Sequence, residues 1–364
     1  MNKLGMVPFF LWLLVSTALA GPDSGVTIVE WGTLKNGESV KLITLQDGAV
    51  RAKIATYGAQ LISLEVPQNV VLGHETLEDA EGGAVYGSVI GRYANRISGG
   101  GFTIDGTRYD LESVNPKTGI QIHGGKTGFQ RQNWEIEPDP GKAGFPEFPV
   151  SITLKLRSPH EHEGFPGNIS VWVQYRLKLT GSENSVVSSY LEIEYRAETD
   201  RATHVNLTNH AYFNLGAGSV AGHQMQLHCR EILEFDDRKI PTGRILEVAG
   251  TPFDYRKPGP IGRNDAEFEG LDHCFVVPAD GNVGTYTNPE TGLSMEIATD
   301  QPGVQIYISN HFKNNPYPKF GAICFETQHY PDTPNQPDFP STLLRPGEPL
   351  KTVTRFSFKG VSRE

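Results

Sequence analysis

The feature that most restricts the fold of this 364-residue sequence is an alternation of apolar and polar residues with a period of two. It is clearest at 169–179, where the odd positions carry Ile, Val, Tyr or Leu, and it recurs at 50–54, 151–157 and 191–196. Successive side chains of a β-strand point to opposite faces, so we expect each stretch to be a strand with one buried face and one exposed face.

Helical periodicity, by contrast, is weak. No apolar pattern at helical spacing continues beyond three turns. A parallel sheet needs crossover helices, so the strands are predicted to pair antiparallel. At 102–109, Asp105-Gly106 separates two short alternating runs, which predicts a tight hairpin. We therefore predict an all-β fold, most simply one large antiparallel β-sandwich, with a single domain over 21–364 because no linker or repeat divides that range.

Composition and charge exclude several classes of protein. With 38% hydrophobic and 20% charged residues, the chain has ample material for a core, which rules out wholesale disorder. The formal net charge of -10 repels a nucleic-acid backbone, so we expect no nucleic-acid partner. Three cysteines, Cys229, Cys274 and Cys324, are too few for a disulfide framework and none lies in a CxxC pair.

The first twenty residues have the pattern of a secretory signal peptide. Lys3 provides positive charge, 7–15 form an apolar stretch, and Ala18-Leu19-Ala20 is a small-residue cleavage site. The apolar stretch is too short to cross a bilayer, and no similar stretch follows it. We therefore expect cleavage after Ala20, a secreted or periplasmic protein, and no membrane association once the signal is removed.

Four of the expected strands oppose an apolar face with polar groups of an unusual kind. An ordinary solvated face carries Lys, Glu and Thr, whereas these faces suit a cleft, with amides for sugar hydroxyls and tyrosines for the faces of a sugar ring. Carboxylate and imidazole groups also serve as general acids and bases. The polar positions are His204, Asn206, Thr208, His210 and Tyr212 in 202–212, Gln305, Tyr307 and Ser309 in 303–310, Glu326 and Gln328 in 322–328, and Gln121 and His123 in 119–124.

Competing motifs are less convincing. The HEHE tract at 160–163 lies in a Pro/Gly-rich loop and lacks the HExxH spacing of a metal helix, so we expect a solvated loop. The GGKT segment at 124–127 lacks the earlier glycine at the required position, and no helical pattern follows it, so we discount a nucleotide site. The GxSxG elbow of serine hydrolases is absent from the sequence.

An ordered series of motifs along nearly all of the chain after residue 20 resembles the aldose 1-epimerases, also called galactose mutarotases. Six motifs in the same order make a chance match untenable. They are GRYANRI at 91–97, HGG at 123–125 with Gly128, Phe129 and Trp134, NLTNHAYFNL at 206–215, LDH at 271–273, GVQIY at 303–307, and FETQHYPDTPNQP at 325–337, which leads into FPSTLLRPG at 339–347.

The resemblance implies a galactose mutarotase-like β-supersandwich with an open sugar cleft and no metal or organic cofactor. It implies that Glu326 is the catalytic base, that His210 is the catalytic acid, and that His123 is a further catalytic-site histidine. It also implies a substrate-binding set that consists of Asn95, Arg96, His123, His210, Tyr212, Asp272 and Gln305. Two departures, Gly-Ile-Gln-Ile before His123 and Ser309-Asn310 after the fifth motif, concern the shape of the pocket and not the acid–base pair.

The function implied is interconversion of the α and β anomers of free hexoses such as galactose or glucose, through acid–base opening and closing of the ring. We expect Glu326 and His210 on opposite edges of a pyranose-sized hollow, in a monomer or homodimer. Two alternatives remain open. A hexose-6-phosphate 1-epimerase would need basic residues at the rim, for which Arg92 and Arg131 are the candidates. A non-catalytic carbohydrate-binding module would have no reason to keep both Glu326 and His210.

Overall fold

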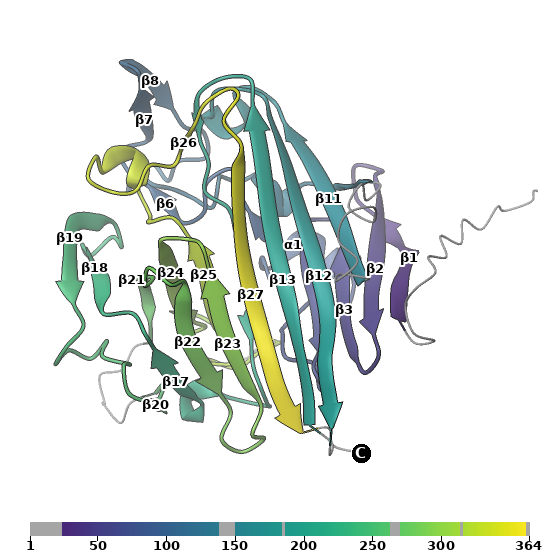
Figure 1. The fold of residues 1–364 in the computed structure, drawn as a ribbon. Coiled ribbons are helices and arrows are strands. Elements are labelled where there is room, and N and C mark those ends of the chain that lie inside the picture. Colours follow the sequence, from purple (N-terminus) through teal and green to yellow (C-terminus); the bar gives the residue numbers. More distant parts are fainter. Residues whose placement is uncertain (1–23, 138–149, 184–185, 263–269, 314–315, 362–364) are drawn as a thin grey trace, which may run out of the picture.

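The computed structural model describes residues 24–137, 150–183, 186–262, 270–313 and 316–361, so the predicted signal peptide at 1–20 lies outside the described residues. Within them the chain is almost entirely antiparallel β-structure, arranged as packed sheets (Figure 1). This confirms the predicted all-β class. The one α-helix among the described residues, α1 (Leu77–Gly82), is capped by Thr76, whose side chain accepts a hydrogen bond from the backbone N–H of Asp79.

The largest sheet has nine strands and includes the alternating sequences that predicted the fold. Its two longest strands, β12 and β13, pair over almost their full length, with Tyr175 opposite Ile193. In spatial order the sheet contains β10 (Glu135–Glu137), β11 (Val150–Ser158), β12 (Ile169–Glu183), β13 (Val186–Thr199), β27 (Leu350–Val361), β23 (Ser294–Thr299), β22 (Asn282–Thr287), β17 (Gln224–Leu227) and β20 (Gly259–Pro260).

Two further sheets complete the main body of the structure. A six-stranded sheet contains, in order, β16 (Tyr212–Phe213), β25 (Ile323–Gln328), β24 (Gly303–Ile308), β21 (Asp272–Val276), β18 (Glu231–Phe235) and β19 (Pro241–Glu247). A four-stranded meander contains β1 (Ser24–Thr33), β2 (Ser39–Asp47), β3 (Val50–Ala55) and β4 (Gln60–Glu65). The meander and the six-stranded sheet lie to either side of the long strands of the largest sheet (Figure 1).

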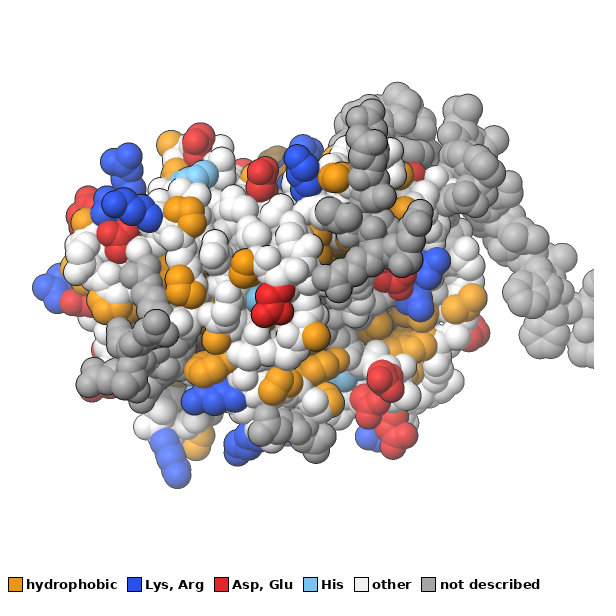
Figure 2. Space-filling model, turned by 90° about the horizontal axis from the view of Figure 1, so that it is seen from below, with side chains coloured by type: hydrophobic (Ala, Val, Ile, Leu, Met, Phe, Trp, Pro, Cys, Tyr) orange, Lys and Arg blue, Asp and Glu red, His pale blue; other side chains and the backbone are white. Residues whose placement is uncertain are grey.

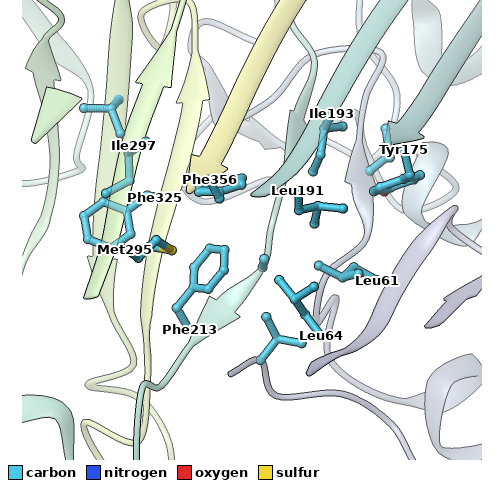
Figure 3. Packing of buried hydrophobic residues seen from close by; sticks show 14 of the residues in the cluster. Leu61, Leu64, Tyr175, Leu191, Ile193, Phe213, Met295, Ile297, Phe325 and Phe356 are labelled. Carbon is cyan, nitrogen blue, oxygen red and sulfur yellow. The ribbon is translucent and has the colours of Figure 1, made fainter. Parts of the chain in front are cut away.

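One hydrophobic cluster joins all three sheets, with buried members from Ile43 in the meander to Phe358 in the C-terminal strand. Phe213 is fully buried within it, and its ring centroid lies 4.9 Å from that of Phe356. Figure 3 shows Phe213 between side chains of the two other sheets, with Met295 on one side and Leu64 on the other. Because the apolar faces are buried here, the opposite, polar face of the six-stranded sheet is not part of this core.

Short two-stranded sheets accompany the larger ones. They pair β5 (Val89–Ile90) with β15 (Thr208–Asn209), β6 (Arg96–Ile97) with β9 (Gln121–Ile122), and β14 (Thr203–His204) with β26 (Leu343–Leu344). The predicted hairpin is confirmed as β7 (Gly101–Ile104) and β8 (Thr107–Asp110). Asp105 and Gly106 both have positive φ there, as a tight turn between right-twisted strands requires.

The predicted continuous strand at 202–212 is wrong. It is broken into β14, β15 and β16, which pair with three different elements, β26, β5 and β25. The polar side is not solvated either, because Asn206, Thr208 and His210 are buried along with their apolar neighbours. The alternation appeared simple because the apolar positions Val205, Leu207 and Ala211 pack in the core while the polar positions between them are also buried.

The cysteines agree with the expectation that they form no disulfide framework. All three cysteines are free and buried. On the face seen from below in Figure 2, basic and acidic side chains are intermixed rather than gathered by sign. No helix among the described residues is long and apolar enough to span a membrane.

Candidate active site

The candidate site is built on the polar face of the six-stranded sheet, where strand register places its residues in rows. Tyr212 pairs with Cys324, Cys324 with Tyr307, and Tyr307 with Asp272, so these four side chains form one row across β16, β25, β24 and β21. In the next row Glu326 lies opposite Gln305. Side chains on one face of adjacent strands come close enough to contact, so the register alone brings these groups together.

His210 lies directly over this face, against Glu326. Its Nε2 is 3.6 Å from Oε1 of Glu326, and both side chains are almost fully buried. The other carboxylate oxygen of Glu326, Oε2, is buried and has no hydrogen-bond partner among the described residues. A buried polar atom without a partner is uncommon, and it commonly marks a place where a ligand or water binds.

The expectation that Glu326 and His210 would face each other across a sugar-wide hollow is wrong. The two groups are neighbours. The chemistry explains the difference, because the two oxygens that exchange protons when a cyclic hemiacetal opens are both bonded to C1. An acid and a base that serve these two oxygens must lie side by side, as they do here.

Burial shifts the pKa values of this pair in opposite directions. Burial and the nearby negative charge of Asp272 raise the pKa of Glu326 to about 8, and Arg96 offsets part of the rise. Burial lowers the pKa of His210 to about 4, against opposing contributions from its own backbone carbonyl and from Asp272. Low dielectric disfavours the charged form of each group, so near neutral pH the pair holds one proton in total.

His123 is fixed by an interlocked pair of left-handed residues. His123 and Asn95 both have positive φ, at 53° and 63°. The backbone N–H of His123 donates to the carbonyl of Asn95, and the backbone N–H of Asn95 donates to Nδ1 of the His123 ring. Strained non-glycine conformations of this kind cluster at functional sites. The second hydrogen bond makes Nδ1 an acceptor, so the neutral ring carries its proton on Nε2.

The predicted strand around His123 has its faces reversed. Gln121 is buried, and its side-chain amide donates to the carbonyls of Glu112 and Glu163, whereas Ile122 is largely exposed. The paired segment is only β9, and His123 follows it in the left-handed turn. The backbone turn, and not strand alternation, therefore directs the imidazole toward His210, with ring centroids 5.4 Å apart.

A polar network borders the pair on the other side. Nε2 of Gln305 donates to Oδ1 of Asp272 at 2.6 Å, and Arg96 contacts Oδ2 of Asp272 at 3.4 Å and donates to the side chain of Asn95. Oε1 of Gln305 is buried and has no partner among the described residues. Glu326, His210, Gln305 and Asn95 are thus a buried centre, and the partly exposed Arg96, Asp272 and His123 form its border.

All eight residues predicted for the site are therefore brought together, but Tyr212 takes a different position from the one expected. Its ring stacks on His210 at 4.9 Å with an interplanar angle of 13°, and Phe312 stacks at 5.4 Å and 23°. Because these two rings lie nearly parallel to it, Tyr212 is not free to pack face-on against a sugar. It instead fixes the plane of the His210 ring.

The geometry of His123 disfavours a metal ion at the same place. Among the described residues, His123, His210 and Glu326 form a group whose ligand atoms all lie within 4.8 Å of one another. Metal-bound imidazole uses an unprotonated nitrogen, while its other nitrogen donates a hydrogen bond. In His123 the lone pair on Nδ1 is occupied by the Asn95 N–H and Nε2 carries the proton, so the arrangement suits proton exchange better than metal binding.

The competing candidates serve structural roles. In the HEHE tract, Glu163 is buried and accepts hydrogen bonds from the backbone and hydroxyl of Thr127, so it holds two loops together. Arg92 is buried, donates to the carbonyls of Pro166 and Gly167, and does not reach the site border.

Comparison with known proteins assigns the fold and the sequence motifs to the same family. The family model described as aldose 1-epimerase matches residues 41–357. The chain belongs to the aldose 1-epimerase family. It is 37% identical to galactose mutarotase from Pongo abelii over 88% of this chain and 95% of that protein, and 36% identical to human galactose mutarotase over 92% and 99%. It is 31% identical to the aldose 1-epimerase of Escherichia coli K12 over 89% and 96%.

Solved structures agree with this family assignment. The galactose 1-epimerase from Lactobacillus acidophilus is 25% identical, with a TM-score of 0.78 over 93% of this chain and 100% of that one. The aldose epimerase homologue from C. elegans is 26% identical, with a TM-score of 0.76 over the same shares. The predicted galactose mutarotase-like sandwich is thereby confirmed.

Two residues in contact with this candidate site were not singled out from the sequence. Cys324 lies two residues before Glu326 on the same face of β25, and its Sγ is 3.5 Å from Nδ1 of His210. Phe312 covers Tyr212 from a loop. The period of two in β25 already placed Cys324 beside Glu326, but the sequence carried no signal for Phe312.

The unusual electrostatics of Glu326 predict a pH-dependent effect of Glu326→Gln on stability. The folded-state pKa lies above the ordinary value of 4.5, so the unfolded chain loses this proton first and wild-type stability falls as pH rises from about 4.5 to about 8. The neutral amide of the variant does not titrate, so the stability of the variant does not fall over this pH range. We expect the variant to have a higher free energy of unfolding than wild type at pH 8 and an equal one at pH 4, measured by urea denaturation.

Glu163→Gln is the matched control with the opposite sign. Burial alone would raise the pKa of Glu163, but hydrogen bonds from Thr127 and Ser113 lower it below its usual value. This variant should be less stable than wild type at pH 8, and the difference should shrink as pH falls through the lowered pKa. An equal effect of Glu326→Gln at both pH values would show that Glu326 is not held as a buried acid.

Proposed function

We propose that this protein is an aldose 1-epimerase that interconverts the α and β anomers of free hexoses such as galactose or glucose. The observation that carries the proposal is the contact between the buried imidazole of His210 and the buried carboxyl of Glu326 at 3.6 Å. Relatives named galactose mutarotase and aldose 1-epimerase, which match nearly the whole chain, support it.

In the proposed reaction the site opens the sugar ring by two coupled proton transfers. Glu326, as the carboxylate, takes the proton of the hydroxyl on C1, while the imidazolium of His210 gives its Nε2 proton to the ring oxygen. The bond between C1 and the ring oxygen breaks, and C1 becomes an aldehyde. Coupling the transfers avoids a free alkoxide or oxonium ion, and each positioned acid or base typically contributes about 10²–10⁴-fold in rate.

Reclosure uses the same two groups in reversed roles. Rotation about the C1–C2 bond presents the other face of the aldehyde. The neutral His210 then takes back the proton of the former ring oxygen as that oxygen attacks C1, and Glu326 returns its proton to the oxygen on C1. The product is the other anomer, and the pair regains its starting protonation state.

The shifted pKa values explain how both forms of the pair are available. With the pKa of Glu326 raised to about 8 and that of His210 lowered to about 4, the Glu326 carboxyl holds the single proton of the pair over most of the intervening pH range. Moving that proton from the carboxyl to the imidazole creates the reactive form without any exchange with solvent. Coupled groups of this kind titrate as a pair.

The remaining site residues are proposed to hold the sugar. His123 stays neutral, because burial and the charges of His210 and Arg96 keep its pKa well below the usual value, and its Nε2–H donates to a sugar oxygen. Asp272 accepts from hydroxyls, Arg96 donates charge-assisted hydrogen bonds, and Oε1 of Gln305 offers an unused acceptor. Asn95 orients both Arg96 and His123, and Tyr212 orients His210.

The alternatives receive less support. Both arginines considered for a sugar phosphate are occupied, since Arg131 donates to the carbonyls of Ala80 and Gly83 while Arg92 is buried among backbone carbonyls. A binding module does not require an acid and a base beside each other. Every described site group comes from one chain, so a monomer or a homodimer would each be complete.

The proposal predicts that Glu326→Gln loses about 10²–10⁴-fold in kcat, because the amide cannot take the proton of the C1 hydroxyl. Glutamine retains the shape and polarity of the glutamate side chain, so sugar binding should persist. Polarimetry on freshly dissolved α-galactose or α-glucose measures the rate, and calorimetric titration with equilibrated sugar measures binding.

Glu30→Gln, on the exposed strand β1, is the control and should leave the rate unchanged. A wild-type protein that binds sugar but does not accelerate the change in optical rotation would favour the binding module. A Glu326→Gln variant with near wild-type kcat would show that another group is the base.

We further propose that the protein is exported and processed after Ala20. The positive Lys3, the apolar stretch at 7–15 and the small residues at 18–20 support this. Intact-mass measurement on the protein recovered from its native host should give a chain that begins at Gly21, outside the cytoplasm. A cytoplasmic protein that retains residues 1–20 would contradict the proposal.

A further inference from the structure

The His210 ring is held on three sides, and one of its contacts has no role in the proton transfers above. Nε2 faces Glu326, and the ring plane is fixed by stacking on Tyr212. The other nitrogen, Nδ1, lies 3.5 Å from Sγ of Cys324. Cys324 is fully buried on the same face of β25 as Glu326, so one strand contacts both nitrogens of the imidazole.

The chemistry of a proton shuttle through Nε2 requires that Nδ1 keep its proton. When imidazolium gives up the Nε2 proton, the neutral ring that remains carries hydrogen on Nδ1, and Nε2 has the lone pair needed for reclosure. A neutral imidazole has one donor and one acceptor nitrogen, and the partner of one nitrogen decides the role of the other. An acceptor next to Nδ1 therefore favours the productive tautomer.

Two acceptors are available to the His210 ring. Next to Nδ1, the Cys324 sulfur is a weak acceptor at hydrogen-bond distance. The backbone carbonyl of His210 itself is the other, and its hydrogen bond to the ring acts to raise the pKa of the imidazole. Both partners are uncharged at neutral pH, since burial keeps the pKa of Cys324 well above its usual value. A carboxylate at this position would stabilise imidazolium strongly and make it a poorer acid, whereas a thiol does not.

We propose that Cys324 is a positioning residue for His210, whose Nδ1–H donates to the sulfur so that Nε2 is the nitrogen that exchanges a proton with Glu326 and the sugar. The neighbouring Tyr212 fixes the plane of the ring, and Cys324 fixes its tautomer and its rotation within that plane. The kinetic consequence rests on the proposed epimerase function, but the tautomer does not.

The tautomer is tested directly by ¹⁵N–¹H correlation spectra of the histidine rings, with the His210 signals assigned by their absence in His210→Gln. In wild type we expect the pattern of an Nδ1–H ring. Cys324→Ala and Cys324→Val should both move His210 toward the Nε2–H tautomer that histidine favours in water. An Nε2–H ring in wild type, or unchanged signals in both variants, would overturn the proposal even if the protein had no epimerase activity.

Kinetics separate positioning from packing. Loss of the acceptor should lower kcat about three- to tenfold, with KM unchanged because the thiol makes no described hydrogen bond to Arg96, Asp272 or His123. Cys324→Ser retains an acceptor atom and should keep more activity than Cys324→Ala or Cys324→Val. If packing were the only role, valine would fill the space and retain the most activity while serine retained the least, which is the opposite order and would reject the proposal.

Cys229→Ala provides the matched control. Cys229 is also a free, buried cysteine, but its Sγ points toward the carbonyl of Val283 at 4.0 Å. Its substitution should lower thermal stability without altering kcat or the His210 spectrum. A fall in kcat for Cys229→Ala as large as that for Cys324→Ala would show that any buried cavity has the same effect, and would overturn the assignment.

Discussion

The structure depends on keeping a carboxyl group and an imidazole beside each other in a place with little water. Among the described residues no cation forms a direct ion pair with Glu326 except His210, and burial outweighs the charges of Arg96 and Asp272, so the two pKa values separate and the pair keeps one proton. Water would remove this effect by solvating each charge. The buried centre beneath a polar border is therefore the basis of the proposed chemistry.

The fold supplies this environment by using both faces of one sheet. The apolar face of the six-stranded sheet packs into the common core, with Phe325 inward, while the next residue along β25, Glu326, points into the site. Register then sets the spacing of the neighbouring groups, and loop segments bring His210 and His123 over them. Side-chain contacts, and strand pairing between Glu326 and Gln305, form a closed circuit from His210 through Glu326, Gln305, Asp272, Arg96, Asn95 and His123 back to His210.

Much of this was predictable from the sequence, and the failures have physical causes. Long strands such as β12 and β13 were correctly predicted because one face of each packs on the core and preserves a period of two. The prediction for 202–212 failed because the segment is buried on both sides, so alternation of residue type does not distinguish buried from exposed positions there. His123 was identified by its motif. The direction of its side chain depends on a left-handed backbone conformation, which an alternating sequence pattern does not predict. The sandwiching of Tyr212 between His210 and Phe312, and the contact of Cys324, are tertiary and have no local pattern.

The most direct test of the shared-proton account is the pH dependence of kcat/KM for mutarotation, corrected for the spontaneous rate. Below about pH 4 both groups are protonated and no base remains, and above about pH 8 the pair has lost its proton and no acid remains. The account predicts a rise through about pH 4, a plateau, and a fall through about pH 8. Activity that continued to rise with pH beyond 8 would show that the ionised carboxylate acts without a protonated partner, and would contradict it.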